Sequence, residues 1–188
     1  MAVVPGQPRP LCTDEQNGAM SGKRSPFIIR NADSEDLDVV LRILALGGSE
    51  GLAPQPPSEL ELQTWNRMMH SQDLTVYLSE IDGEGVGTAA LMTMPHVTYQ
   101  CAPTAFIEAV VVVPGFRRQG VATGLMERAL SDAQSLGCNK VQLLSHKRHA
   151  RDGAHRLYEN LGFEAEAEGF RLYLKQVPSA VAAARTTS

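Results

Sequence analysis

The chain has 188 residues, with 17 Lys and Arg against 21 Asp and Glu, which gives a formal net charge of −4 at pH 7. This balance gives no support for binding to nucleic acid or to an anionic membrane. No apolar run approaches membrane-spanning length, and the first residues lack the charged and apolar regions of a signal peptide. The three cysteines, Cys12, Cys101 and Cys138, lack metal-ligand spacing, so we expect a cytoplasmic protein without a metal site.

A single domain accounts for the chain apart from its two ends. Residues 1–25 are rich in Pro, Gly and polar side chains and have little to bury, and residues 177–188 look similar. We therefore expect two flexible tails around one domain at 26–176, which contains no internal repeat.

Apolar periodicity and turn residues predict the secondary structure in chain order. The first half of the domain should contain a strand at 27–30, a helix capped by Asp33 with an apolar face from Leu37 to Leu44, a loop at 47–58, a helix at 59–71, a strand at 74–81, a turn at 82–85 and a strand at 86–94. The second half should contain a loop at 95–103, a strand at 104–113, a helix at 118–136 that Gly137 ends, a strand at 140–145, a helix that stops at Gly162 and a strand that starts at Phe163. This order predicts a mixed α/β fold.

The junction between the strand at 104–113 and the following helix has the composition of an anion site. Pro114 and Gly115 end the strand, and Arg117-x-x-Gly120-x-Ala122 leads into apolar residues at helical spacing. Small residues let backbone N–H groups close around an anion, and the positive end of the helix dipole favours negative charge. The Lys-Ser/Thr ending of a P-loop is absent, and the glycines do not have the Gly-x-Gly-x-x-Gly spacing of a dinucleotide-binding loop. These residues alone therefore do not show which anion binds.

Two motifs resemble the GNAT superfamily of acyl-CoA-dependent N-acetyltransferases. Arg117, Gly120 and Ala122 fill the fixed positions of its pyrophosphate loop, Gln/Arg-x-x-Gly-x-Gly/Ala. Residues 154–163 are similar to the Ala-x-x-Phe/Leu-Tyr-x-x-x-Gly-Phe ending of its last main helix. The resemblance covers about residues 27–175. It implies a single GNAT-like domain with a central, mixed, mostly antiparallel sheet, a splayed strand pair and about four flanking helices, and it implies acetyl-CoA as co-substrate.

The resemblance also implies which residues hold the cofactor. Backbone groups of the splayed strand pair with the pantetheine arm in this family, which by position are those of Val110, Val111 and Val112, although a valine run is also typical of a plain core strand. The pyrophosphate would lie on the backbone amides of the loop, which belong to Arg118, Gln119, Gly120, Val121, Ala122 and Thr123. The side chains of Arg117 and Arg118 could reach phosphates or stay solvated. Arg151 replaces an asparagine that many members carry and could instead reach a CoA phosphate or a substrate anion.

Acetyl transfer to an amine requires a neutral nucleophile, a donor for the oxyanion and a proton for the leaving thiolate. The resemblance implies Glu108 as general base, acting directly or through water, and Tyr158 as general acid. Strand alternation places Glu108 on one face with Phe106 and Val110, among apolar neighbours where a lone buried charge is costly. A surface carboxylate or structural ion pair remains the alternative for Glu108, and an amphipathic core tyrosine the alternative for Tyr158.

The sequence therefore predicts an N-acetyltransferase that works by direct transfer in a ternary complex. A covalent thiol route has no support, because the only cysteine near either motif is Cys138, at the far end of the helix. A small-molecule amine is the first choice of acceptor, and a protein N-terminus or lysine the second. A catalytically silent acyl-CoA-binding module and an unrelated nucleotide binder are the other classes, and a homodimer is expected by analogy alone.

Two groups of residues are less informative about the acceptor. The basic segment 146–151 fits an acceptor that carries phosphate or phosphonate, or simply a solvated loop. Four residues on segments that wall the acceptor pocket in this family could equally be packing or surface, namely Glu50, Trp65, His96 and Tyr99.

Overall fold

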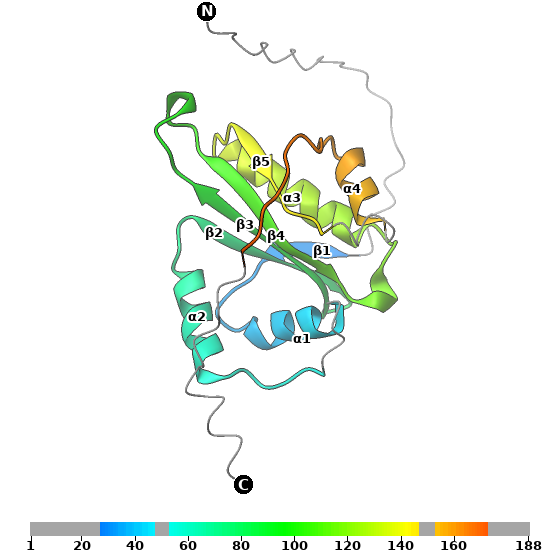
Figure 1. Cartoon of the computed structure of the whole chain (residues 1–188). Coiled ribbons are helices and arrows are strands. Elements are labelled where there is room, and N and C mark those ends of the chain that lie inside the picture. Colours follow the sequence, from blue (N-terminus) through cyan, green and yellow to red (C-terminus); the bar gives the residue numbers. More distant parts are fainter. Residues whose placement is uncertain (1–26, 48–52, 147–152, 173–188) are drawn as a thin grey trace, which may run out of the picture.

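The computed structural model describes residues 27–47, 53–146 and 153–172, which form one sheet between two layers of helices (Figure 1). The elements are β1 (Ile28–Asn31), α1 (Leu37–Gly47), α2 (Glu59–Met69), β2 (Leu74–Ile81), β3 (Glu84–Met94), β4 (Thr104–Val112), α3 (Val121–Ser135), β5 (Lys140–Gln142) and α4 (Ala154–Asn160), with short 3₁₀ turns at Tyr99–Cys101 and Pro114–Phe116. The five strands lie in the order β1-β2-β3-β4-β5, and only the pair β4–β5 is parallel. This architecture confirms the predicted fold class.

Local sequence signals determine several of these boundaries. The two-residue turn Asp82-Gly83 joins β2 to β3, and both residues have positive φ, 50° and 81°, as the tightest hairpin turns require. α2 begins at a capping box in which the Ser58 side chain accepts from the Glu61 amide and the Glu61 carboxylate accepts from the Ser58 amide. Gly137, with φ 72°, follows the end of α3 as expected.

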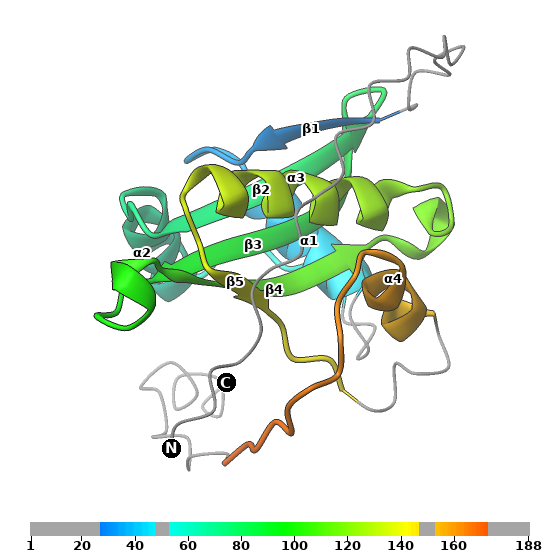
Figure 2. The same cartoon turned by 90° about the horizontal axis from the view of Figure 1, so that it is seen from above.

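Two apolar cores lie on opposite faces of the sheet. Figure 2 shows α3 and α4 on one of these faces and α1 on the other. The core under α3 and α4 is built around Tyr77, Leu91 and Leu125, which are all but inaccessible to solvent. The core under α1 and α2 is built around Ile43 and Leu78. Because β3 and β4 contribute side chains to both cores, the middle of the sheet is held rigidly on either side.

One ionic cluster ties β1 to β2 and to the start of α1. The Arg30 guanidinium donates to both carboxylate oxygens of the buried Asp36, at 2.6 and 2.7 Å, and to Glu80 at 2.6 Å. Hydrogen bonding from Arg30 lowers the pKa of Asp36 below its usual value. Asp36 also accepts from the Asp33 amide at 2.8 Å, so the cluster fixes the path of the chain into α1.

Several predicted element ends are wrong. The Asp33 carboxylate accepts from the Glu35 amide at 2.9 Å and so caps a turn that precedes α1, which begins only at Leu37. α3 begins at Val121 and not at 118, because Gly120 adopts a left-handed conformation with φ 87°. β5 ends at Gln142 and not at 145, because the chain leaves β4 there.

The strand predicted to begin at Phe163 is also wrong, because residues 163–172 belong to no strand in the described part of the chain. Residues 164–169 alternate Glu with Ala and Gly, so they offer a sheet no large apolar face to bury. The apolar side chains that follow, Phe170 and Leu172, are 90% and 85% exposed. The predicted tails at 1–25 and 177–188 lie outside the described residues.

Candidate functional site

β4 and β5 separate part of the way along their length. They pair only where Thr104, Ala105 and Phe106 face Lys140, Val141 and Gln142, whereas β4 continues to Val112. From Ile107 onward, no described strand pairs with this edge of β4. Backbone N–H and C=O groups on an unpaired strand edge are available to an extended ligand. Figure 2 shows the chain after β5 turning away from β4 at this opening.

A β-bulge lies at the opening. Thr88 and Ala90 of β3 face Val111 and Glu108, so two residues of β4, Ala109 and Val110, stand against one residue of β3. Ala109 has a φ of 52°, which is unusual for a residue with a side chain. The extra residue reverses the alternation of side chains that follow it.

The bulge overturns the prediction that Glu108 and Val110 share a face. Val110 and Val112 contribute to the core under α3, as Ile107 does, whereas Val111 packs against the core under α1 and α2. The valine side chains are therefore core residues, while the backbone of the same residues forms the free edge. The core-strand alternative is therefore correct for the side chains, and the backbone edge is left available to a ligand.

Glu108 lies on the face that α1 and α2 partly cover. It stands directly opposite Ala90, which packs against the core under these helices. The side chain is exposed, so the expectation of a carboxylate buried among apolar neighbours is wrong. Among the described residues, no donor or cation lies within hydrogen-bond or ion-pair distance of this carboxylate, so it is available to a ligand.

The loop after β4 ends in free backbone donors. The first backbone hydrogen bond of α3 runs from the Gly124 amide to the Gly120 carbonyl at 2.9 Å. The amides of Val121, Ala122 and Thr123 have no acceptor among the described residues, and Gly120 provides no side-chain cap. Three free N–H groups at the positive end of a 15-residue helix can bind an anion.

The loop's own side chains stabilise its conformation. The Arg117 guanidinium donates to the Val112 carbonyl at 3.0 Å and to the Gly47 carbonyl at 2.9 Å, which joins the end of β4 to the end of α1. The Gln119 side chain donates to the Gly115 carbonyl at 3.1 Å. Arg118 has a φ of 61° and an exposed side chain. Arg117 is therefore already engaged, whereas Arg118 extends into solvent.

Tyr158 lies on α4 on the opposite side of the sheet from Glu108. It is half-buried against the core under α3, and its ring meets that of Phe163 edge-to-face at 6.0 Å. Gly162, with φ 85°, ends this helix as predicted, and the Phe163 amide donates to the Tyr158 carbonyl at 3.0 Å. Figure 2 places α4 beside the later half of β4, next to the opening. Glu108 and Tyr158 thus flank the separated strands from opposite faces.

The remaining candidates fall into different places. Trp65 is buried, and its indole N–H donates to the Asp33 carbonyl at 3.1 Å, so it is a packing residue. His96 and Tyr99 lie in the β3–β4 loop, where His96 Nε2 is 2.9 Å from the Thr104 hydroxyl. Glu50, Arg151 and most of the basic segment at 146–151 lie outside the described residues. Within the described ranges, no three His, Cys, Asp or Glu residues gather as a metal site, and no helix is long and apolar enough to span a membrane.

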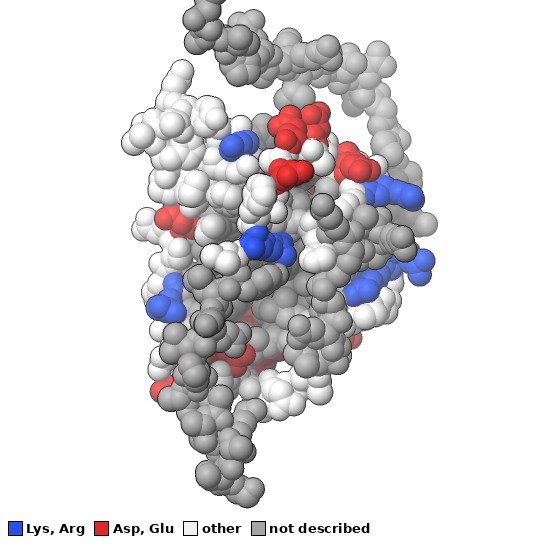
Figure 3. Space-filling model, in the orientation of Figure 1, with Lys and Arg blue, Asp and Glu red and all other residues white. Residues whose placement is uncertain are grey.

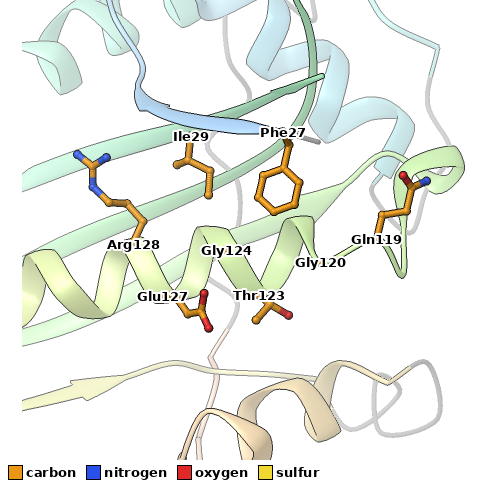
Figure 4. A pocket seen from close by; sticks show the side chains of 8 residues that line it. All are labelled: Phe27, Ile29, Gln119, Gly120, Thr123, Gly124, Glu127 and Arg128. Carbon is orange, nitrogen blue, oxygen red and sulfur yellow. The ribbon is translucent and has the colours of Figure 1, made fainter. Parts of the chain in front are cut away.

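An open pocket along α3 was not predicted from the sequence. It has a volume of about 600 Å³, and it extends from the free amide end of α3 along the helix toward β1 (Figure 4). Its floor includes the ring of Phe27, which packs so closely on Gly124 that a Cβ there would lie 2.8 Å from it. A glycine within the helix at 124 indicates close packing against a neighbour, but the sequence does not indicate that this neighbour is Phe27.

The sequence and the structure of this chain are both similar to those of known proteins. The acetyltransferase (GNAT) family model matches residues 41–163. A glucosamine 6-phosphate N-acetyltransferase of Trypanosoma brucei brucei is 34% identical over 99 residues, which cover 53% of this chain and 64% of that protein, just under two thirds of its length. An aminoglycoside N(6′)-acetyltransferase type 1 of Salmonella typhimurium is 25% identical over 127 residues, 66% of this chain and 86% of that protein. The crystal structure of a transcriptional regulator from Bacillus halodurans C-125 matches with a TM-score of 0.72 at 27% identity, over 79% of this chain and 99% of that one.

The site therefore combines a bulged strand that separates from its parallel neighbour with free amides at the start of α3. The chain belongs to the acetyltransferase (GNAT) family. Members of this family are acetyl-CoA-dependent N-acetyltransferases.

Proposed function

We propose that this protein transfers the acetyl group of acetyl-CoA to a small-molecule primary amine by direct attack in a ternary complex. The observation that carries the proposal is the continuity of the free β4 edge with the free amides of α3. An extended pantetheine arm can pair with a strand edge, and a pyrophosphate can bind a helix N-terminus. One molecule of acetyl-CoA would use both features at once.

The donor site would be almost entirely backbone. The amides of residues 118–123 would hold the pyrophosphate, and the backbone of Val110, Val111 and Val112 would pair with the pantetheine arm. Arg117 would act by holding the loop, because its guanidinium is occupied by two carbonyls. The Arg118 side chain, and Arg151 outside the described residues, would be available to phosphate groups.

The chemistry would use the two groups that flank the opening. Glu108, directly or through a water molecule, takes a proton from the acceptor ammonium, and the neutral nitrogen attacks the thioester carbonyl. Backbone N–H groups at the bulge would stabilise the oxyanion of the tetrahedral intermediate. The carbon–sulfur bond then breaks, and Tyr158 donates a proton to the departing thiolate. The nitrogen loses its second proton, which returns through water to the Tyr158 phenolate, giving an acetamide, CoA with a free thiol and a neutral tyrosine.

A small-molecule acceptor is supported by the acceptors named for two relatives, glucosamine 6-phosphate and aminoglycosides. Both are amines of low molecular weight. A protein amine is the alternative, and the relatives above do not favour it.

Paired conservative substitutions test the assignment of base and acid. Glu108→Gln and Tyr158→Phe should each lower kcat by about 10²–10⁴-fold, the usual contribution of general acid–base catalysis. Neither change removes a backbone donor, so the thermal stabilisation by acetyl-CoA should persist in both variants. If both variants keep full turnover, the assigned roles are wrong. If acetyl-CoA stabilises the protein while no amine is ever acetylated, the chain is a silent acyl-CoA-binding module.

A further inference from the structure

The sheet face around Glu108 carries apolar side chains that no described helix covers. Met92 and Met94 of β3 are 43% and 45% exposed, although both are large and apolar. Met92 stands directly opposite Phe106 of β4 on one side and Leu74 of β2 on the other. We call Met92, Met94 and Phe106 the methionine strip.

The methionine strip begins next to the proposed base. Along β3 and β4 the pair Ala90–Glu108 is followed, two residues on, by the pair Met92–Phe106, so both pairs face the same side of the sheet. Two residues of strand span about 7 Å, which is close to the length of a small acceptor. A nitrogen beside Glu108 would therefore place the rest of its molecule over the strip.

The charges around the methionine strip favour a single cation at its Glu108 end. No described residue pairs with the Glu108 carboxylate, and the strip itself contains no charged side chain. Lys140 lies across from Thr104 at the far end, with its Nζ 5.8 Å from the centroid of the Tyr99 ring. An ammonium beside Glu108 is favoured electrostatically, while a second ammonium near Lys140 is disfavoured.

Figure 3 shows a largely uncharged described surface at the β3–β4 hairpin, with several acidic groups gathered beside it near the top of the view. Methionine side chains are flexible and polarisable, so they adapt to aliphatic and aromatic groups alike. A sugar phosphate would require several polar partners. The described face offers Gln142, opposite Phe106, and Lys140 beyond the end of the strip, whereas the strip itself presents only apolar side chains.

We propose that the acceptor is a primary monoamine with an apolar aliphatic or aromatic body. Its ammonium lies beside Glu108, and its body lies on Met92, Met94 and Phe106. This inference rests on the proposed function, because it assigns the acceptor half of the same site. The named acceptors of the two relatives, a sugar phosphate and aminoglycosides, are polar, so the inference separates this chain from them.

A comparison of four amines tests the proposal directly. Release of CoA thiol is measured with 2-phenylethylamine, hexylamine, glucosamine 6-phosphate and spermidine at saturating acetyl-CoA. The kcat/KM values for the first two should exceed those for the last two by at least tenfold. Equal or higher values for glucosamine 6-phosphate or spermidine would overturn the apolar acceptor and leave the transferase function intact. A folded protein that acetyl-CoA does not stabilise would instead contradict the proposed function itself.

Substitution within the strip provides the second arm. Met92→Ser should raise KM for 2-phenylethylamine roughly tenfold and leave KM for acetyl-CoA unchanged. Leu136→Ser is the matched control, because Leu136 is 55% exposed and follows the end of α3, away from the strip. If both variants leave KM for the amine unchanged, the strip does not contact the acceptor. If Met92→Ser alters the oligomeric state in size-exclusion chromatography, the strip is an interface between copies, which also overturns the proposal.

Discussion

Gly87 of β3 is the residue on which the first turn of α3 rests, so enlarging it should disturb fold and donor site together. A Cβ at this position would lie 2.8 Å from Val121 Cγ1, 3.1 Å from Leu125 Cδ1 and 3.3 Å from the Val111 carbonyl oxygen. Two of these atoms belong to side chains of α3 that are fully buried, and the third is backbone. The side chains have no room to move away, so the helix N-terminus must shift from the sheet.

The size of the effect follows from two opposing contributions. Overpacking a rigid core costs about 1–3 kcal/mol, whereas replacing Gly by Ala returns about 0.4–1 kcal/mol through the unfolded state. Gly87→Ala should therefore lower the free energy of unfolding by roughly 0.5–2 kcal/mol, and each kcal/mol lowers Tm by about 2–4 °C in a protein of this size. Acetyl-CoA should also stabilise the variant less than it stabilises the wild type.

Urea and thermal unfolding with and without acetyl-CoA measure both effects. Gly115→Ala is the matched control, because its Cβ would meet no atom within 4 Å and its φ is not positive. The control should have the same stability as the wild type and bind acetyl-CoA with the same affinity. A Gly87→Ala protein with unchanged stability and unchanged acetyl-CoA binding would refute the close coupling of β3 to the start of α3.

Three further predictions concern the loop and the ionic cluster. Gly120→Ala forces a side chain into a left-handed conformation with φ 87°, at a cost of about 1–2 kcal/mol. The Kd for acetyl-CoA measured by calorimetry should therefore rise about 5- to 30-fold. An unchanged Kd would mean that the loop does not bind the anion. Asp36→Asn should lower the free energy of unfolding by about 1–3 kcal/mol at pH 7. Because Arg30 lowers the pKa of the folded Asp36 carboxylate, its contribution is present above the unfolded pKa of about 4 and is lost as the pH falls through the folded pKa. Urea unfolding should therefore show the stabilities of wild type and variant converging in acid. Arg117→Lys, which cannot donate to two carbonyls in a fixed fork, should lower Tm by a few degrees, and an unaltered Tm would show that these two bonds contribute nothing.

The parts of the fold that were predicted correctly depend on short-range signals. The strand at 74–81 and its hairpin turn follow from a short, largely apolar run and the Asp-Gly pair that comes after it. Gly137 and Gly162 mark helix ends because a left-handed cap needs no partner elsewhere in the chain. The motif resemblance likewise depends on contiguous residues, so it identified the family without any knowledge of packing.

The parts that were wrong depend on partners distant in sequence. The bulge at Ala109 arises from how β4 registers on β3, and nothing in the valine run indicates it. Glu108 is exposed because α1 and α2 do not extend over that part of the sheet, which the sequence of β4 cannot show. Trp65 was left open between pocket wall and packing, and its bond to the Asp33 carbonyl, 32 residues away, decides for packing.

Acetyl transfer can be observed directly by mixing the protein with acetyl-CoA and a panel of primary amines and following thiol release and acetylated product together. We expect CoA and one acetamide in equal amounts, formed only when amine is present and lost in the Glu108→Gln variant. Thiol release that is no faster with any amine than with buffer, in protein that circular dichroism shows to be folded, would contradict it.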